Sequence, residues 1–163
     1  MVTQLWTRDL SQIRSARVRR LHEYWRAKGA QRDGLPLRRD VDPAELRDLL
    51  PFMMIVDVER DPMRFRYRLV GTRVVEFNHR EFTGLYLGTI GWQDEQVLLD
   101  AYVEVTTNRR ARFGYYTWEL RSGGLGNCEF VLLPLSGESG RIDQIVALED
   151  YDFPLIDIDP TRI

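Results

Sequence analysis

Apolar and polar positions alternate most clearly over residues 64–70, where the period of two predicts a β-strand. Phe65, Tyr67 and Leu69 fall on one predicted face, and three arginines fall on the other. Such a charged row is typical of the solvated face of a half-buried strand and discourages edge pairing. An anion site is the alternative interpretation of the three arginines.

Four further segments have the length and the content of apolar and aromatic residues that predict strands. The first is joined to 64–70 through the turn pair Asp61-Pro62, which predicts a β-hairpin. The last three follow one another directly and are separated by glycine-containing turns, which favours antiparallel pairing. These four segments are residues 52–59, 111–120, 128–135 and 142–150.

Helical spacing of apolar residues appears in two longer segments, 10–28 and 93–109. A shorter helix is predicted over 42–51, because Asp42 is a good cap and Pro43 suits the first helical position. Short helical segments and turns fill residues 72–90. The order of elements predicts an α+β fold in which one face of an antiparallel sheet packs on the helices.

Composition is ordinary for a soluble globular protein, with 44% apolar and 29% charged residues in 163 positions. No apolar run approaches the roughly 20 residues that span a bilayer. The N-terminus lacks the pattern of a signal peptide. The single cysteine, Cys128, excludes an intramolecular disulfide and fits a reducing compartment. We therefore expect a cytoplasmic protein with no membrane contact.

Charge is uneven along the chain although the net charge is only −2. Residues 1–40 carry ten basic and four acidic residues, net +6, whereas residues 137–163 carry two and seven, net −5. The two ends are expected to attract, within a subunit or between subunits. The basic face of residues 14–28 could contact phosphates, but a solvated helix face is the simpler interpretation. The net charge gives no general attraction to nucleic acid.

Three motifs in this order resemble the PAS domain superfamily. They are Tyr67-Arg-Leu-Val-Gly-Thr72, then Phe82-Thr-Gly84-Leu-Tyr-Leu87, then Leu132-Leu-Pro-Leu-Ser136 with a glycine turn and Ile142-Asp-Gln-Ile145. More narrowly, the chain is similar to a proteobacterial PAS-like family with a helical lead-in that ends in Asp-Pro and Leu-Leu-Pro. Here these are Asp42-Pro43 and Leu49-Leu50-Pro51. The resemblance covers roughly residues 20–150.

The resemblance implies a PAS-like five-stranded antiparallel sheet with short helices and one longer helix on one face, plus an N-terminal helical extension. It also implies a sensory or regulatory module with a small-molecule cavity, dimerisation through the N-terminal helix and a downstream partner protein of unknown identity. We divide the chain into the extension and loop (1–41), the PAS-like domain (42–152) and an acidic tail (153–163), which we expect to run extended over the surface. The chain has no room for an output domain, so we expect it to signal by protein contacts.

The candidate ligand site lies between the face carrying Phe65, Tyr67 and Leu69 and segment 73–92. Aromatic residues would line it and an arginine would orient a polar ligand. For the aromatic strand 113–118, a packed core is the alternative interpretation. The candidate ligand-binding residues are Tyr67, Arg73, Phe77, His79, Phe82, Trp92, Arg112, Tyr115 and Trp118.

The usual cofactors of such domains lack their ligands in this sequence, so the identity of the ligand is open. Haem needs a well-placed axial ligand, and helix 93–109 contains no histidine. A zinc site needs three or four converging ligands, but His22, His79 and Cys128 are distant in sequence. Flavin photosensors carry their cysteine on a helix, whereas Cys128 lies on a late strand and is expected to be a small buried apolar residue.

Catalysis is not expected, and no catalytic residue is assigned. The acidic pairs Asp57 with Glu59 and Glu149 with Asp150 lie at strand ends and are expected to be solvated, the second pair on opposite faces. One alternative is a small isomerase or dehydratase, which would need a buried Asp, Glu or His with a perturbed pKa in the cavity. A nucleic-acid or protein adaptor that uses the N-terminal helix is the other.

Overall fold

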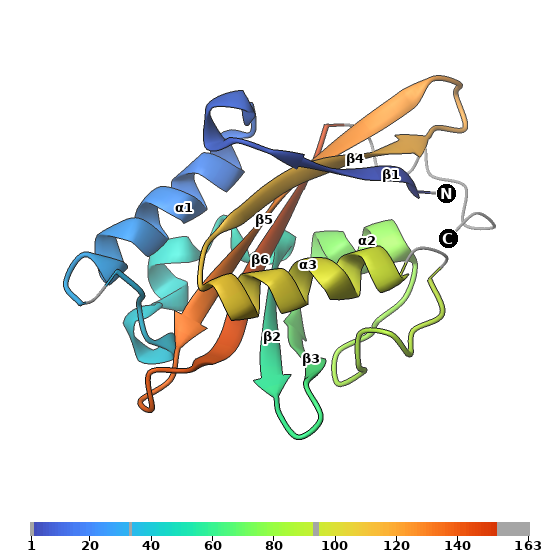
Figure 1. Ribbon diagram of the computed structural model, residues 1–163. Helices are drawn as coiled ribbons and strands as arrows, with labels where there is room; N and C mark the ends of the chain where they lie inside the picture. Colours follow the sequence, from blue (N-terminus) through green and yellow to red (C-terminus); the bar gives the residue numbers. More distant parts are fainter. Residues whose placement is uncertain (1, 33, 93–94, 153–163) are drawn as a thin grey trace.

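The computed structural model describes residues 2–32, 34–92 and 95–152, and its core is one six-stranded antiparallel sheet (Figure 1). The predicted α+β class is confirmed. The strands follow the order β1-β4-β5-β6-β2-β3 across the sheet. Their bounds are β1 Val2–Arg8, β2 Met53–Glu59, β3 Arg64–Val70, β4 Arg112–Glu119, β5 Leu125–Ser136 and β6 Ile142–Tyr151.

Strand β1 was not predicted from the sequence. It pairs antiparallel with β4 at the edge of the sheet, with a register shift between Val2 and Leu5. Its residues, Val-Thr-Gln-Leu-Trp-Thr-Arg, mix polar and apolar side chains without strict alternation. The strand is therefore defined by the backbone that it pairs with rather than by its own pattern.

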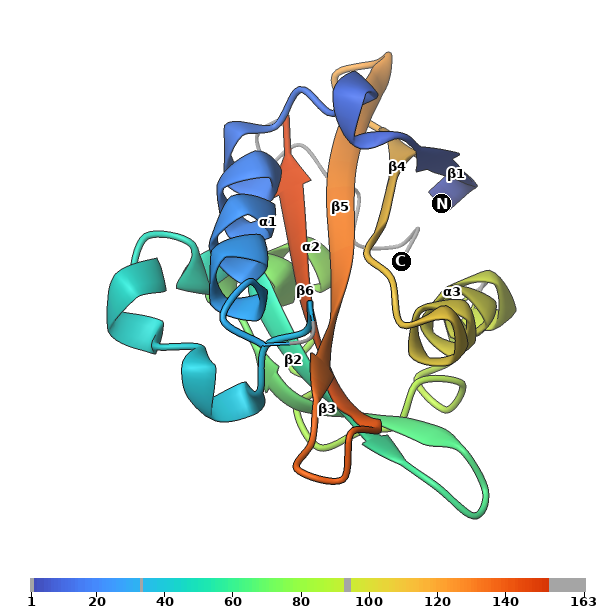
Figure 2. The same cartoon turned by 60° about the vertical axis from the view of Figure 1, so that its left-hand side comes forward.

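Helices cover both faces of the sheet, whereas helices on one face only were expected. Figure 2 shows α1 on one side of β5 and β6 and α3 on the other. We call the side of α2 and α3 the inner face and the side of α1 the outer face. The α-helices are α1 Ala16–Gly29, α2 Thr72–Asn78 and α3 Glu95–Asn108.

Two of the predicted helices are shorter than expected. The segment predicted over 10–28 begins as a separate 3-10 turn, and α1 starts after Ser15, whose side chain accepts a hydrogen bond from Val18 N at 3.0 Å. The segment predicted over 42–51 is made of 3-10 turns. Residues 93–94 of the predicted helix 93–109 and the predicted tail 153–163 lie outside the described residues. The 3-10 segments are Leu10–Gln12, Arg38–Asp40, Pro43–Leu46 and Leu50–Phe52.

Two apolar clusters share the central strands. On β5, Cys128, Phe130 and Leu132 belong to the inner cluster, whereas Val131, Leu133 and Leu135 belong to the outer cluster. A strand that is buried on both faces reads as a nearly continuous apolar run, which is why residues 130–135 lack alternation. The outer cluster contains Ile13, Val18, Leu21, Val41, Leu46, Leu49, Met53, Phe113, Val131, Leu133, Leu135, Val146 and Leu148.

Strand β3 contains an irregularity that the sequence pattern did not predict. Its register against β2 shifts between Ile55 and Val56, which pair with Leu69 and Tyr67. A bulge of this kind moves the following side chains to the other face. Leu69 is therefore 40% exposed, whereas Val70 packs against the inner cluster. The prediction that Leu69 shares a face with Phe65 and Tyr67 is wrong.

The lead-in segment is bound to the sheet of its own chain. Trp25 packs against the outer cluster, and its indole N–H donates to Pro134 O at 2.8 Å. Arg17 pairs with Asp150 at 2.9 Å, so the expected attraction between the basic and acidic ends occurs within one chain at this pair. Within the described ranges, no helix has the length and apolar character needed to cross a membrane.

Candidate functional site

The inner face has a carboxyl group among its aromatic side chains. Strand β6 alternates at its end, so that Glu149 and Tyr151 point to the inner face and Asp150 points to the outer face. Tyr116 Oη donates to Glu149 Oε2 at 3.0 Å, and Tyr151 Oη donates to the same oxygen at 2.5 Å. The prediction that Glu149 is a solvated carboxylate is wrong, whereas its separation from Asp150 onto opposite faces is confirmed.

Burial controls the protonation of this group. The residue keeps partial exposure, but its surroundings are mostly protein, and this burial raises the pKa of the Glu149 carboxyl group above its ordinary value. The hydrogen bonds from Tyr151 and Tyr116 act in the opposite direction. Burial also raises the pKa of Tyr67, Tyr102, Tyr116, Tyr151 and Cys128, and the charge of Glu149 adds to the rise at each.

Trp118 supplies an unsatisfied donor on the same face. Its side chain is 3% exposed, and its indole N–H has no hydrogen-bond partner in the part of the chain that the structure describes. Its ring packs edge-on against Phe77 with the centroids 4.8 Å apart. Phe77 in turn stacks on Tyr151 at 4.6 Å, so α2 joins the indole to the residues around Glu149.

A second aromatic group lies beside the first, at the edge strand β3. Tyr67 meets Phe82 edge-on at 4.7 Å, and Phe82 meets Trp92 at 5.1 Å. The backbone after Phe82 covers this group, because Tyr67 N donates to Leu85 O and Gly84 N donates to Tyr67 O. The cover therefore runs along β3 as an additional short extended segment.

Glu95 organises the next part of this cover. Its carboxylate accepts from the backbone N–H groups of Gly88 at 2.9 Å, Ile90 at 3.0 Å and Gly91 at 3.0 Å. Three bonds from one loop to the first turn of α3 fix the loop that leads to Trp92. This role of Glu95 was not predicted from the sequence, because it depends on the path of the loop.

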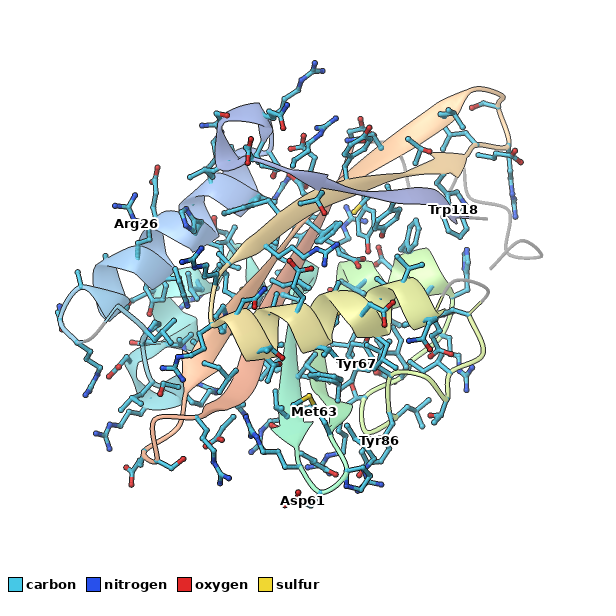
Figure 3. All side chains as sticks on the ribbon, viewed as in Figure 1. Arg26, Asp61, Met63, Tyr67, Tyr86 and Trp118 are labelled. Carbon is cyan, nitrogen blue, oxygen red and sulfur yellow. The ribbon has the colours of Figure 1, made fainter. Side chains whose placement is uncertain are left out.

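The structure brings five of the predicted site residues together on the inner face. Figure 3 labels Tyr67 on β3 and Trp118 toward the end of β4. Both belong to the inner cluster, as do the predicted residues Phe77 and Phe82. Trp92, also predicted, packs against this cluster. Their contact with a ligand stays a prediction.

The other four predicted residues lie elsewhere. Arg73 is exposed and pairs with Glu76 at 2.8 Å. His79 is exposed at the end of α2, where it has a positive φ of 48°. Arg112 and Tyr115 both lie on β4.

Arg112 and Tyr115 lie on opposite faces of β4. The Arg112 guanidinium pairs with Glu104 of α3 and donates to Thr7 Oγ1 at 3.1 Å. Tyr115 lies on the outer face, where the guanidinium carbon of Arg8 is 3.7 Å from its ring centroid. The strand alternation that turns Trp118 inward turns Tyr115 outward, so Tyr115 does not join the other aromatic candidates.

The arginine row of β3 is neutralised by carboxylates on β2. Arg66 pairs with Asp57 at 3.1 Å, and Arg64 pairs with Glu59 at 2.8 Å. The arginines of these pairs are about half-exposed, as expected for the solvated face of a strand, and their carboxylate partners leave little charge for an anion site. Within the described ranges, no three His, Cys, Asp or Glu side chains are grouped as metal ligands.

Two outer-face carboxylates hold the start of α1, a role that the sequence did not predict for either of them. Glu129 is 3% exposed and accepts from the backbone N–H groups of Arg14 and Ser15 at 2.8 and 2.6 Å. Arg8 completes its partners at 2.6 Å. Asp150, opposite Glu129 in the register, accepts from Ser15 Oγ at 2.6 Å. The position of Glu129 inside an apolar strand segment was the sequence feature that could have predicted a buried carboxylate.

Comparison with known proteins gives one family match. The sequence model of a PAS domain family matches residues 13–148. No curated protein matches the chain. Among solved structures, an RNA-binding light-oxygen-voltage receptor is similar, with a TM-score of 0.46 and 15% identity over 72% of this chain and 36% of that chain.

Two further structures are similar over most of their length. A light-oxygen-voltage domain studied with a flavin analogue has a TM-score of 0.49 and 7% identity, over 68% of this chain and 83% of that chain. The PAS domain of a protein from Colwellia psychrerythraea has a TM-score of 0.44 and 13% identity, over 68% and 97%. What these proteins bind remains a property of those proteins.

Proposed function

Because the chain belongs to the PAS domain family, we propose that it is a sensory module that binds a small molecule on the inner face of its sheet. The candidate residues for this contact are the aromatic ones gathered there, with Glu149 added. The lead-in 1–41 would serve the read-out and 42–152 would hold the ligand. The single cysteine supports a reducing, cytoplasmic setting.

The unsatisfied indole N–H of Trp118 is the observation that carries this proposal. Buried donors in folded proteins nearly always have a partner, and one left alone costs about 1–3 kcal/mol. A ligand that offers an acceptor near Phe77 would remove this cost. Functional sites are where such exceptions concentrate, and the indole lies in the inner cluster together with Tyr67, Phe77 and Phe82.

The read-out would pass through the end of β6. Glu149 and Tyr151 face the candidate site, and Asp150 between them holds Ser15 and Arg17 of the lead-in. A ligand that shifts this strand end would shift the start of α1. The apolar side of α1 packs on its own sheet, so a second copy or a downstream protein would contact its exposed side.

Catalysis is the weaker alternative. Glu149 meets the requirement for a buried acid with a perturbed pKa. Its hydrogen-bond partners are two phenol donors, and no serine, cysteine or lysine nucleophile is hydrogen-bonded to it within the described residues. Asp57 and Glu59 lie on the outer face, bonded to arginines. The arrangement therefore favours binding over turnover.

A nucleic-acid adaptor is also less favoured. Basic residues of α1 are engaged by acidic neighbours in the same chain, Arg17 with Asp150 and Lys28 with Glu45 at 2.9 Å each. Arg20 pairs likewise with Asp48. These pairs reduce the positive field that would attract phosphates.

Native mass spectrometry of the purified protein, combined with an absorbance spectrum, tests the proposal. We expect a co-purified small molecule in the wild type, a lower bound fraction in Trp118→Phe, and no change in Tyr115→Phe, which alters the outer face of the same strand. The same spectra give the subunit count and so test the dimer. Protein that is ligand-free after mild purification, with no visible absorbance, would contradict the binding function.

A further inference from the structure

Resting on the proposed function, we propose that the ligand is a small organic amine, bound as its cation with an ammonium N–H donated to Glu149 Oε1. The proposal concerns the chemistry of the ligand and not the existence of the site. It is carried by three features of the inner face: an open acceptor, an uncompensated carboxylate and a group of aromatic rings.

The open acceptor is the second oxygen of Glu149. Both phenol donors, Tyr116 and Tyr151, bond to Oε2. Oε1 accepts no hydrogen bond from the residues that the structure describes. The partial exposure of Glu149 gives a ligand access to this oxygen. An ionised carboxylate accepts hydrogen bonds and donates none, so the ligand atom that meets Oε1 must be a hydrogen-bond donor.

The carboxylate also lacks a counter-ion. None of the ion pairs among residues 2–32, 34–92 and 95–152 includes Glu149. Arg112, which β4 directs toward α3, already pairs with Glu104. An enclosed carboxylate without a cation is costly, and the raised pKa of Glu149 reflects this cost. A ligand with one positive charge would restore balance and favour the ionised form.

Aromatic rings surround the same group. Tyr116 and Tyr151 bond to Glu149, Phe77 lies 6.1 Å from Tyr116 and 4.6 Å from Tyr151, and Phe130 lies 6.5 Å from Tyr116, all between ring centroids. Aromatic faces attract organic cations, most strongly where water is excluded. An acid within an aromatic group therefore selects an ammonium ion over an anion, which the carboxylate would repel. A bare metal ion would lack ligands here, because no three His, Cys, Asp or Glu side chains are grouped among the described residues.

Three probes of similar size and different charge test this assignment on the full chain: benzylammonium, benzyl alcohol and benzoate. Each is titrated at millimolar concentration while the backbone signals of β6 are followed by nuclear magnetic resonance. We expect benzylammonium to bind about tenfold more tightly than benzyl alcohol, and benzoate to bind most weakly. The ranking in the wild type needs no variant and so does not depend on the folding of one.

Glu149→Gln then locates the charge effect, because the amide keeps an acceptor and a similar shape. We expect it to remove the advantage of benzylammonium and to leave benzyl alcohol within about twofold. Tyr115→Phe, on the other face, should change neither. Equal binding of the three probes, tightest binding of benzoate, or binding of none would overturn the amine assignment. A neutral or anionic molecule found by native mass spectrometry would also overturn it, yet would support the proposed binding function.

Discussion

Glu129 on β5 accepts the backbone N–H of Ser15 at 2.6 Å, although the two residues are 114 positions apart in the sequence. Ser15 is the N-cap residue of α1, so the strand holds the helix at its N-terminal end. Replacing Glu129 by alanine would leave two backbone donors and the Arg8 guanidinium without their acceptor. Removing one partner of a buried ion pair is strongly destabilising, because the other charge is left buried without compensation.

We therefore expect Glu129→Ala to lower the free energy of unfolding by about 3–5 kcal/mol, measured by urea denaturation. Glu138→Ala is the matched control, because its pair with Arg39 is exposed on both sides and is worth less than about 1 kcal/mol. Losses of similar size in the two variants would show that Glu129 does not anchor the lead-in.

His22 should make the protein sensitive to mild acid. Its ring is buried on α1 and lies edge-on to Phe113 with centroids 4.9 Å apart. Burial, and then the charge of Arg26, lower the pKa of His22 below its ordinary value of 6.5. A lowered folded-state pKa means that the unfolded chain takes up the proton first.

The contribution of neutral His22 to the free energy of unfolding is thus fully present above pH 6.5. It is lost as pH falls through the lower folded-state pKa. We expect the urea midpoint of the wild type to fall over this interval, and His22→Phe to flatten that part of the profile. His79→Gln should keep the wild-type profile, because His79 is exposed. An unchanged slope in His22→Phe would count against the burial effect.

The pH effect of Glu149 should have the opposite sign. Its folded-state pKa is raised by burial above the ordinary value of 4.5. The contribution of protonated Glu149 to the free energy of unfolding is therefore fully present below pH 4.5 and is lost as pH rises through the folded-state pKa. In ligand-free protein, Glu149→Gln should gain stability relative to the wild type as pH rises above 4.5. Parallel urea titrations of the two proteins measure this difference, and a constant offset at all pH values would contradict it.

Glu95 should control the order of the cover near Trp92. Glu95→Ala removes the acceptor of three loop N–H groups, those of Gly88, Ile90 and Gly91. We expect hydrogen exchange at these amides to become faster while the β5 and β6 amides keep their protection. Gln96→Ala, one position later with an exposed bond to Asp100, is the control. Unchanged exchange in the loop would show that other contacts hold it.

The sequence predicted much of the fold because local patterns report burial and backbone direction. Strand β3 has the bounds of its predicted segment, and the predicted strand 142–150 ends one residue before β6 does. The bulge that exposes Leu69 depends on pairing with β2, which no local pattern encodes. Coverage of both faces, and the edge strand β1, likewise depend on contacts between distant segments.

The candidate site shows the same division. Aromatic residues such as Phe77 and Trp118 were identified because their types favour burial. Glu149 was missed because a carboxylate at a strand end is usually solvated. Its inward position follows from the alternation of Ile145, Ala147 and Glu149 along β6, and the neighbours that enclose it come from other strands.

Strands β5 and β6 wall both apolar clusters, with Phe130 on one side and Val131 on the other. If one cluster unfolds, the other loses the strands that it packs on, so the two clusters are expected to unfold cooperatively. Heating should therefore produce a single cooperative transition, with the calorimetric and van't Hoff enthalpies equal. Unfolding of α1 alone would remove the packing on the outer face of β5 and β6. The inner cluster would then unfold in the same transition, because it packs on the other face of these strands.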